Sequence, residues 1–113
     1  MAEENDIQLF AEQLVRLNAS MKELFDSGNV ALFTEMNRAI KELHRIQTAS
    51  KAVALSAVKE ECEIVYKNFD MIIAVLRTTE NGEIDEGAQG ALNKLLHNID
   101  SAVVRIAAAL KLV

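Results

Sequence analysis

The sequence predicts an all-α protein, an antiparallel helical bundle of three or four helices. The chain of 113 residues contains no Pro and only four Gly, so very few positions force it out of a helix. Its apolar residues recur at spacings of three and four, and no long segment alternates at a spacing of two. Half of the residues are hydrophobic, enough to bury a core, and residues 1–113 are expected to form a single domain.

The first helix is predicted from about Asn5 to Phe25, because one apolar stripe runs along it. The stripe consists of Ile7, Phe10, Leu14, Leu17, Met21 and Leu24. Gly28 suits the C-terminal cap of this helix, and Asn29 can cap the next one.

The second helical pattern opens at Val30 and meets no Gly or Pro until Gly82. Its apolar stripe begins with Phe33, Met36, Ile40 and Leu43 and continues with Val53, Ala57, Ile64, Ile72 and Leu76. Between these two groups, residues 47–50 weaken the pattern. Two alternatives remain open: one helix of about fifty residues, ~75 Å long and in need of a partner chain to cover it, or a turn near Thr48–Lys51. The turn is the more economical of the two.

The next break is predicted at Thr78–Gly82, and the last helix from about Asp85 to the C-terminus. The seam of this helix is formed by Leu92, Leu95, Ile99, Ala102, Ile106 and Ala109.

Charge and composition exclude several classes of function. The net charge of −5 argues against nucleic-acid binding, which needs clustered Lys and Arg. The N-terminal MAEENDIQLF has acids where a signal peptide has bases, and no stretch approaches the ~20 apolar residues of a membrane span. We therefore expect a cytoplasmic protein with no nucleic-acid and no membrane partner.

No cofactor, metal site or enzyme active site is predicted. The segment ENGEIDEG resembles a calcium loop, but Arg77 and Ala88 stand where its first and twelfth positions need carboxylates. His97 and Asp100 could supply two metal ligands, which do not make a site. The single cysteine, Cys62, excludes an internal disulfide, and its three glutamate neighbours are expected to raise the pKa of the thiol.

The stretch HRIQTASKAVALSAVKEEC, residues 44–62, resembles the core of histidine-containing phosphotransfer (HPt) domains, which are four-helix bundles. The positions of the family motif are occupied here by His44, Ile46, Gln47, Thr48, Ala49, Ser50, Val53 and Val58. The resemblance implies that His44 is a phosphoacceptor. Three positions depart from the family pattern: Gln47 replaces its lysine, and Thr48 and Ala54 replace its glycines.

A competing alignment leaves no phosphoacceptor. The segment NVALFTEMNRAIK resembles the segment before the active histidine in the phosphotransfer domains of chemotaxis kinases, and it puts Lys41 at the histidine position. On the helical phase of its segment, His44 lies at the rim of the apolar stripe, with Arg38, Lys41 and Arg45 further round as a positive surface. Such a surface could stabilise a phosphoryl group or dock an acidic partner.

Two functions from different classes follow. The first is a non-enzymatic protein-interaction module (an adaptor, a regulator or a secretion-chaperone-like protein) that docks on a partner protein through Arg38, Lys41, His44, Arg45 and Gln47. Its first hairpin, MKELFDSGNVALFTEM, resembles that of small secretion and flagellar export chaperones. The alternative is an HPt-like phosphocarrier on His44, or a degenerate relative that only docks a response regulator. A homo-oligomer is compatible with both.

Overall fold

The structure, a computed structural model, describes residues 2–29, 31–78 and 86–111. Its helices are α1 (Ala2–Ser27), α2 (Leu32–Ala49), α3 (Val53–Ala57), α4 (Lys59–Thr78) and α5 (Glu86–Ala109). Helices account for 91% of the described residues, and none of these residues lies in a strand. The predicted all-α bundle is confirmed, with four long helices and one short one in the part described.

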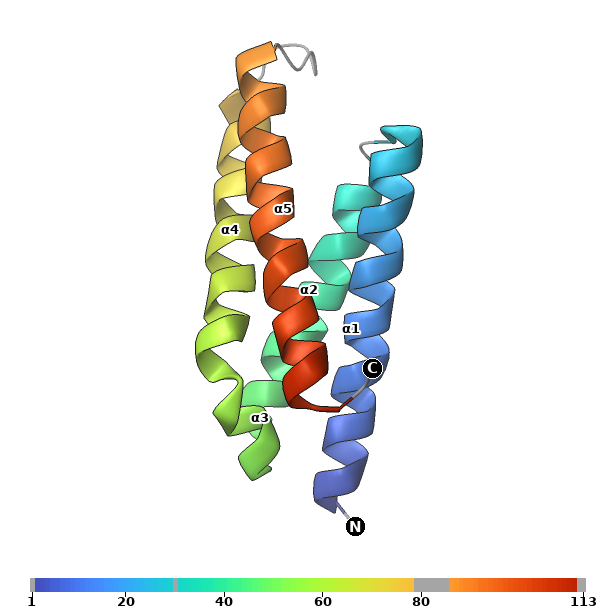
Figure 1. Cartoon of the computed structure of the whole chain (residues 1–113), viewed down its shortest axis with the longest axis vertical. Helices are drawn as coiled ribbons and strands as arrows, with labels where there is room; N and C mark the ends of the chain where they lie inside the picture. Colours follow the sequence, from blue (N-terminus) through green and yellow to red (C-terminus); the bar gives the residue numbers. More distant parts are fainter. Residues whose placement is uncertain (1, 30, 79–85, 112–113) are drawn as a thin grey trace.

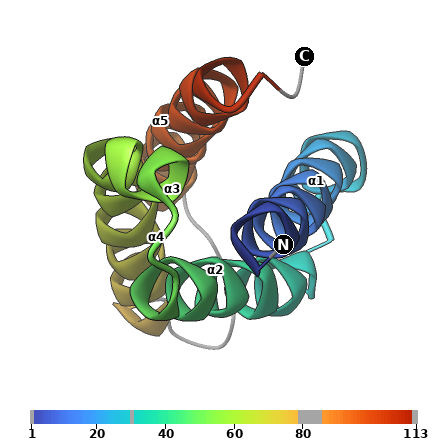
Figure 2. The same ribbon diagram turned by 90° about the horizontal axis from the view of Figure 1, so that it is seen from below.

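The four long helices run alternately up and down in a bundle of 48 × 23 × 19 Å (Figure 1). α1 packs along α2 and α4 packs along α5, so the chain forms two antiparallel hairpins. The contacts of α1 with α5 and of α2 with α4 are less extensive. Seen from below, α3 lies at the end of the bundle where the chain passes from one hairpin to the other (Figure 2).

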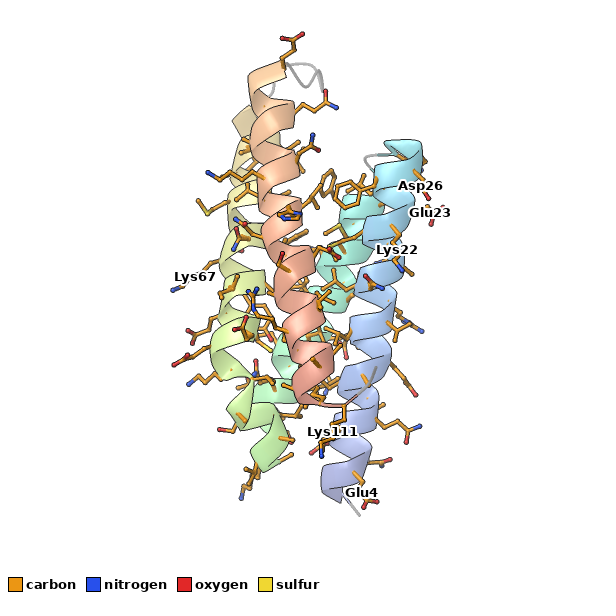
Figure 3. All side chains as sticks on the ribbon, viewed as in Figure 1. Glu4, Lys22, Glu23, Asp26, Lys67 and Lys111 are labelled. Carbon is orange, nitrogen blue, oxygen red and sulfur yellow. The ribbon has the colours of Figure 1, made fainter. Side chains whose placement is uncertain are left out.

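The apolar faces of the four long helices meet in one buried core. In α1 the predicted stripe is buried from Phe10 to Leu24, and Ile7 packs against it partly exposed. The four stripe residues of α2 and the first five of α5 are also buried, but Ala109, in the last turn of α5, is exposed. Charged side chains such as Glu4 and Lys67 project outward from the bundle (Figure 3).

The turn between α1 and α2 confirms the role of Gly28 and corrects that of Asn29. Gly28 has a φ of +67°, a backbone conformation that residues with a side chain rarely adopt. Its N–H donates a 2.8 Å hydrogen bond to the carbonyl of Leu24. The Asn29 side chain accepts a 3.1 Å hydrogen bond from the N–H of Ala31, but Ala31 itself holds the N-cap position of α2. Asn29 therefore shapes the turn and does not cap the helix. Val30, the predicted start of this helix, lies outside the described residues.

The chain turns after α2, so the single helix of about fifty residues is wrong and the turn is confirmed. Ser50 and Ala52 have extended backbones, with ψ of 145° and 128°. The Ser50 hydroxyl accepts a hydrogen bond from the N–H of Ala52 (3.1 Å) and donates one to the carboxylate of Asp6 in α1 (2.9 Å). These bonds give the backbone an alternative to continuing the helix, so the turn forms without Gly or Pro.

The predicted stripe from Val53 to Leu76 is wrong at its start. Val53 is 79% exposed and Ala57 is exposed, whereas Leu55, Val58, Cys62, Val65, Phe69 and Ile72 are buried. The chain bends again at Val58 between α3 and α4, so the helical phase restarts twice after α2. The predicted break at Thr78–Gly82 and the helix start at Asp85 fall mostly outside the described residues, although α4 does end at Thr78.

Candidate functional site

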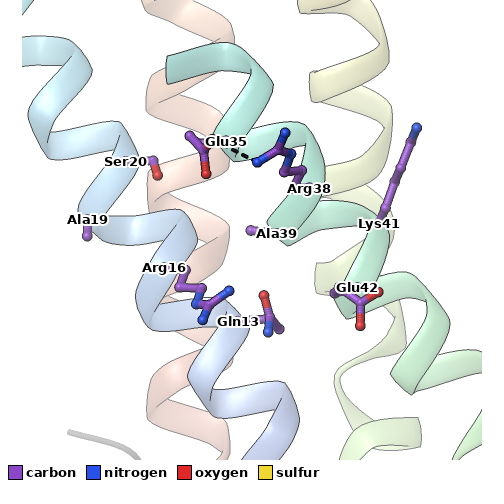
Figure 4. A pocket seen from close by; sticks show the side chains of 9 residues that line it. All are labelled: Gln13, Arg16, Ala19, Ser20, Glu35, Arg38, Ala39, Lys41 and Glu42. Atoms are coloured by element: carbon purple, nitrogen blue, oxygen red, sulfur yellow. Dashed lines mark hydrogen bonds and ion pairs between the residues drawn. The ribbon is translucent and has the colours of Figure 1, made fainter. Parts of the chain in front are cut away.

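Four of the five predicted site residues, all on α2, line two separate hollows. The first is a groove of about 640 Å³ between α1 and α2. It is lined by Gln13, Arg16, Ala19, Ser20, Glu35, Arg38, Ala39, Lys41 and Glu42. Ala39 carries only a methyl group on the side of α2 that faces α1, and this short side chain helps to leave the groove open (Figure 4).

The groove combines paired and unpaired charges. Arg38 and Glu35, one helical turn apart on α2, form an ion pair of 3.2 Å. Arg16 reaches from α1 into the groove and forms no ion pair with any other residue that the structure describes (Figure 4). Lys41 borders the groove, but its side chain extends away from it (Figure 4). The guanidinium of Arg16 is therefore the group in the groove most available to an acidic partner.

Arg45, the third base of the predicted positive surface, lines neither hollow. Its guanidinium forms a 2.7 Å ion pair with Glu42, which borders the groove. The hydrogen bond from Arg45 holds the pKa of the Glu42 carboxyl below its usual value, and the same bond raises the pKa of Arg45. Both side chains are well exposed, so the pair adds little to stability.

The second hollow contains His44 and is a cavity of about 330 Å³ between α2, α3 and α4. It is lined by His44, Gln47, Thr48, Ser50, Ser56, Lys59, Glu63 and Tyr66. His44 is exposed at the rim of α2, as its helical phase predicts. Its ring packs edge to face on Tyr66 of α4, with 5.0 Å between the ring centroids and 80° between the planes.

Gln47 links three helices at the base of this cavity. Its side-chain N–H donates a 3.1 Å hydrogen bond to the carbonyl of Leu55 in α3, and its side-chain oxygen accepts a 2.9 Å bond from the Tyr66 hydroxyl. Both the N–H and the oxygen of the side-chain amide thus form hydrogen bonds within the protein. Gln47, expected from the sequence to bind a partner, here holds α2, α3 and α4 together.

Lys59 is the cation that lines the same cavity as His44, and sequence reasoning missed it. It lines the cavity and forms no ion pair with another described residue, whereas none of Arg38, Lys41 and Arg45 lines this cavity. Lys59 opens α4, so its position depends on the bends on both sides of α3. From the sequence, Lys59 could be noticed only as a basic residue, because the spacing along one continuous helix does not place it near His44.

Cys62 lies next to this cavity and carries an inert thiol. It is 2% exposed, and burial raises the pKa of the thiol to about 11. The predicted direction is confirmed, but the predicted cause is secondary: the charge of Glu61 adds less than burial does. Tyr66 has a raised pKa as well, chiefly through burial and then through its proximity to Cys62.

The positions that resemble an HPt domain are spread over several elements. His44, Ile46, Gln47, Thr48 and Ala49 lie on α2, whereas Ser50 ends this helix. Val53, matched to an apolar position, is exposed on α3, and Val58 lies between α3 and α4. His44 is thus five residues from the end of its helix, and the pattern after it is not continued in one helix.

The remaining features add no further site. Among the described residues no group of three or more His, Cys, Asp or Glu side chains is placed to hold a metal ion. None of the helices in the described part is long and apolar enough to span a membrane. The calcium-loop segment falls almost wholly outside the described residues. No protein-family model, curated protein or solved structure matches this chain.

Proposed function

We propose that this chain is a cytoplasmic, non-enzymatic interaction module that docks a partner protein in the groove between α1 and α2. The observation that carries the proposal is the groove itself: Ala39, whose small side chain is buried, is part of its lining, and Arg16 enters it without an ionic partner among the described residues. Small side chains allow a second helix to approach closely, and a guanidinium selects a carboxylate on it. An adaptor, a regulator or a secretion-chaperone-like protein needs a surface of this kind.

Site-specific photo-crosslinking in the native cell tests this proposal. A photo-reactive amino acid at Ser20, in the groove, should give a crosslinked protein product, whereas the same group at Lys67, exposed on α4, should not. Arg16→Glu should lower the yield from Ser20. Lys67→Glu, which changes the charge by the same amount elsewhere, should leave it unchanged. Equal crosslinking from both positions, or a yield insensitive to Arg16→Glu, would count against the groove.

A second candidate function is supported by Lys59. A phosphoryl group on an imidazole needs a nearby cation, and Lys59 shares the cavity with His44. In an HPt-like phosphocarrier, the group would pass from the acyl phosphate of a response regulator to a ring nitrogen of His44, leaving the aspartate carboxylate of the regulator behind. Glu63 in the same cavity opposes a second negative charge, so transfer would be slow.

Incubation with phosphorylated response regulators separates the two candidates. For a phosphocarrier, acid-labile label should appear on the wild type, vanish in His44→Ala and fall in Lys59→Gln, with Lys41→Gln as the matched control. Absence of label on the wild type would reject phosphotransfer. If a regulator still bound in that case, the chain would be the degenerate relative that docks without chemistry.

A further inference from the structure

The cavity that His44 lines carries two opposite charges that are not paired with each other. Lys59 and Glu63 both line it, and they lie four residues apart on α4, so their side chains share one face of the helix. Neither forms an ion pair with another residue that the structure describes. A lysine that precedes a glutamate is the weaker order for an ion pair along a helix. Both charges are therefore available to a third group.

Three further polar side chains of this cavity have no hydrogen-bond partner among the described residues. They are the imidazole of His44 and the hydroxyls of Thr48 and Ser56. Gln47 and Ser50, by contrast, form hydrogen bonds within the fold. Hydrogen bonds thus fix the base of the cavity, and donors and acceptors without protein partners surround it. Small-molecule sites combine a formed cavity with a few convergent polar groups in the same way.

The size and the charges of the cavity restrict what it can hold. Its volume of about 330 Å³ is at the lower end of the roughly 300–1,000 Å³ of small-molecule sites, which favours a small ligand. A simple anion would be attracted by Lys59 but repelled by Glu63, and a simple cation would meet the reverse. A ligand that carries both charges satisfies both residues.

We propose that this cavity binds a free α-amino acid, with the carboxylate of the ligand on Lys59 and its ammonium group on Glu63. The direction of α4 supports this orientation, because the helix begins at Lys59 and the positive end of its dipole favours a carboxylate there. The hydroxyls of Thr48 and Ser56 can donate hydrogen bonds to the carboxylate or accept them from the ammonium group.

This binding site goes beyond both proposed functions and rests on neither. The docking groove lies between α1 and α2, whereas the cavity lies between α2, α3 and α4. Phosphotransfer requires a covalent bond to His44, whereas an amino acid would be held reversibly by charges and hydrogen bonds. A chain that takes no phosphoryl group or docks no partner can still bind an amino acid, and the reverse also holds.

NMR titration of the isotope-labelled protein with single amino acids tests the site. Glycine, alanine or serine should shift the amide resonances of the residues around the cavity. Lys59→Gln and Glu63→Gln should each raise the Kd about tenfold, because each removes one charge-assisted hydrogen bond. Lys67→Gln and Glu60→Gln are the matched controls, since both residues are exposed on α4 outside the cavity, and Lys67 projects outward (Figure 3). They should leave the Kd unchanged.

Modified ligands show which group of the ligand meets which residue. The N-acetyl derivative lacks the ammonium group and should bind the wild type about tenfold more weakly than the amino acid, but Glu63→Gln should not distinguish the two. The amide derivative lacks the carboxylate, and Lys59→Gln should not distinguish it from the amino acid. The proposal would be overturned if no amino acid shifted the resonances around the cavity, or if inorganic phosphate bound more tightly than every amino acid. An unchanged Kd in Lys59→Gln and Glu63→Gln would also reject it.

Discussion

Replacing Gln47 with Ala should lower the free energy of unfolding by about 2 kcal/mol, because it removes two hydrogen bonds worth roughly 1 kcal/mol each. These are the bonds to the Leu55 carbonyl and from the Tyr66 hydroxyl, both part-buried. Water can reach the abandoned groups only in part, so little of the loss is recovered. For a domain of this size, about 2 kcal/mol corresponds to a fall in Tm of roughly 8 °C.

Urea denaturation followed by circular dichroism measures this change. Lys41→Ala is the matched control, because Lys41 is exposed on the same helix and Lys and Gln have similar helix propensities. It should alter the free energy of unfolding by less than about 0.5 kcal/mol. A double-mutant cycle of Gln47→Ala with Tyr66→Phe should give a coupling energy of about 1 kcal/mol. If Gln47→Ala were as stable as the wild type, or the two changes were additive, Gln47 would not be the link between the three helices.

Three further outcomes are expected. In urea denaturation, Ile72→Ala should lower the free energy of unfolding by about 2–5 kcal/mol and Val53→Ala by less than about 0.5 kcal/mol, because only Ile72 is buried. Similar losses for the two variants would contradict the packing of α3 and α4. Burial raises the pKa of the Cys62 thiol to about 11 in the folded state, so the free energy of unfolding should fall as the pH rises from about 9 to about 11. Cys62→Ala should make the dependence of this free energy on pH shallower by up to about 1.4 kcal/mol per pH unit. An unchanged pH dependence would refute the raised pKa of Cys62. Millimolar Ca²⁺ should leave Tm unchanged, because Arg77 and Ala88 supply no carboxylate; a rise would show a calcium site.

The first half of the fold could be predicted from the sequence because α1 and α2 are uninterrupted helices. In such helices the spacing of three and four keeps its phase from end to end, so every predicted stripe residue from Phe10 to Leu43 is buried, although the buried Leu32 and Ala39 were not predicted. After Ala49 the phase restarts twice, at Ser50 and at Val58, with no Gly or Pro to mark either position. The bend at Ser50 is held by Asp6, far away in the sequence, and no local pattern could reveal that contact.

The candidate site could be predicted only where it depends on one helix. The position of His44 at the rim of α2 follows from its phase, and so does the separation of Arg38 from the core. The pairing of Gln47 with Leu55 and Tyr66 depends on the path of the chain through α3, and so does the presence of Lys59 in the cavity that His44 lines. Side chains brought together by a bend cannot be paired by counting residues along a helix.

The division into two hairpins also bears on how the chain reaches this structure. Each hairpin joins helices that follow one another in sequence, so most contacts form across short separations. Low contact order favours folding in microseconds to milliseconds, and each hairpin can form before the two meet. Contacts between hairpins are then made late. Substitutions there, such as those at the Gln47–Tyr66 hydrogen bond between α2 and α4, should accelerate unfolding far more than they slow folding.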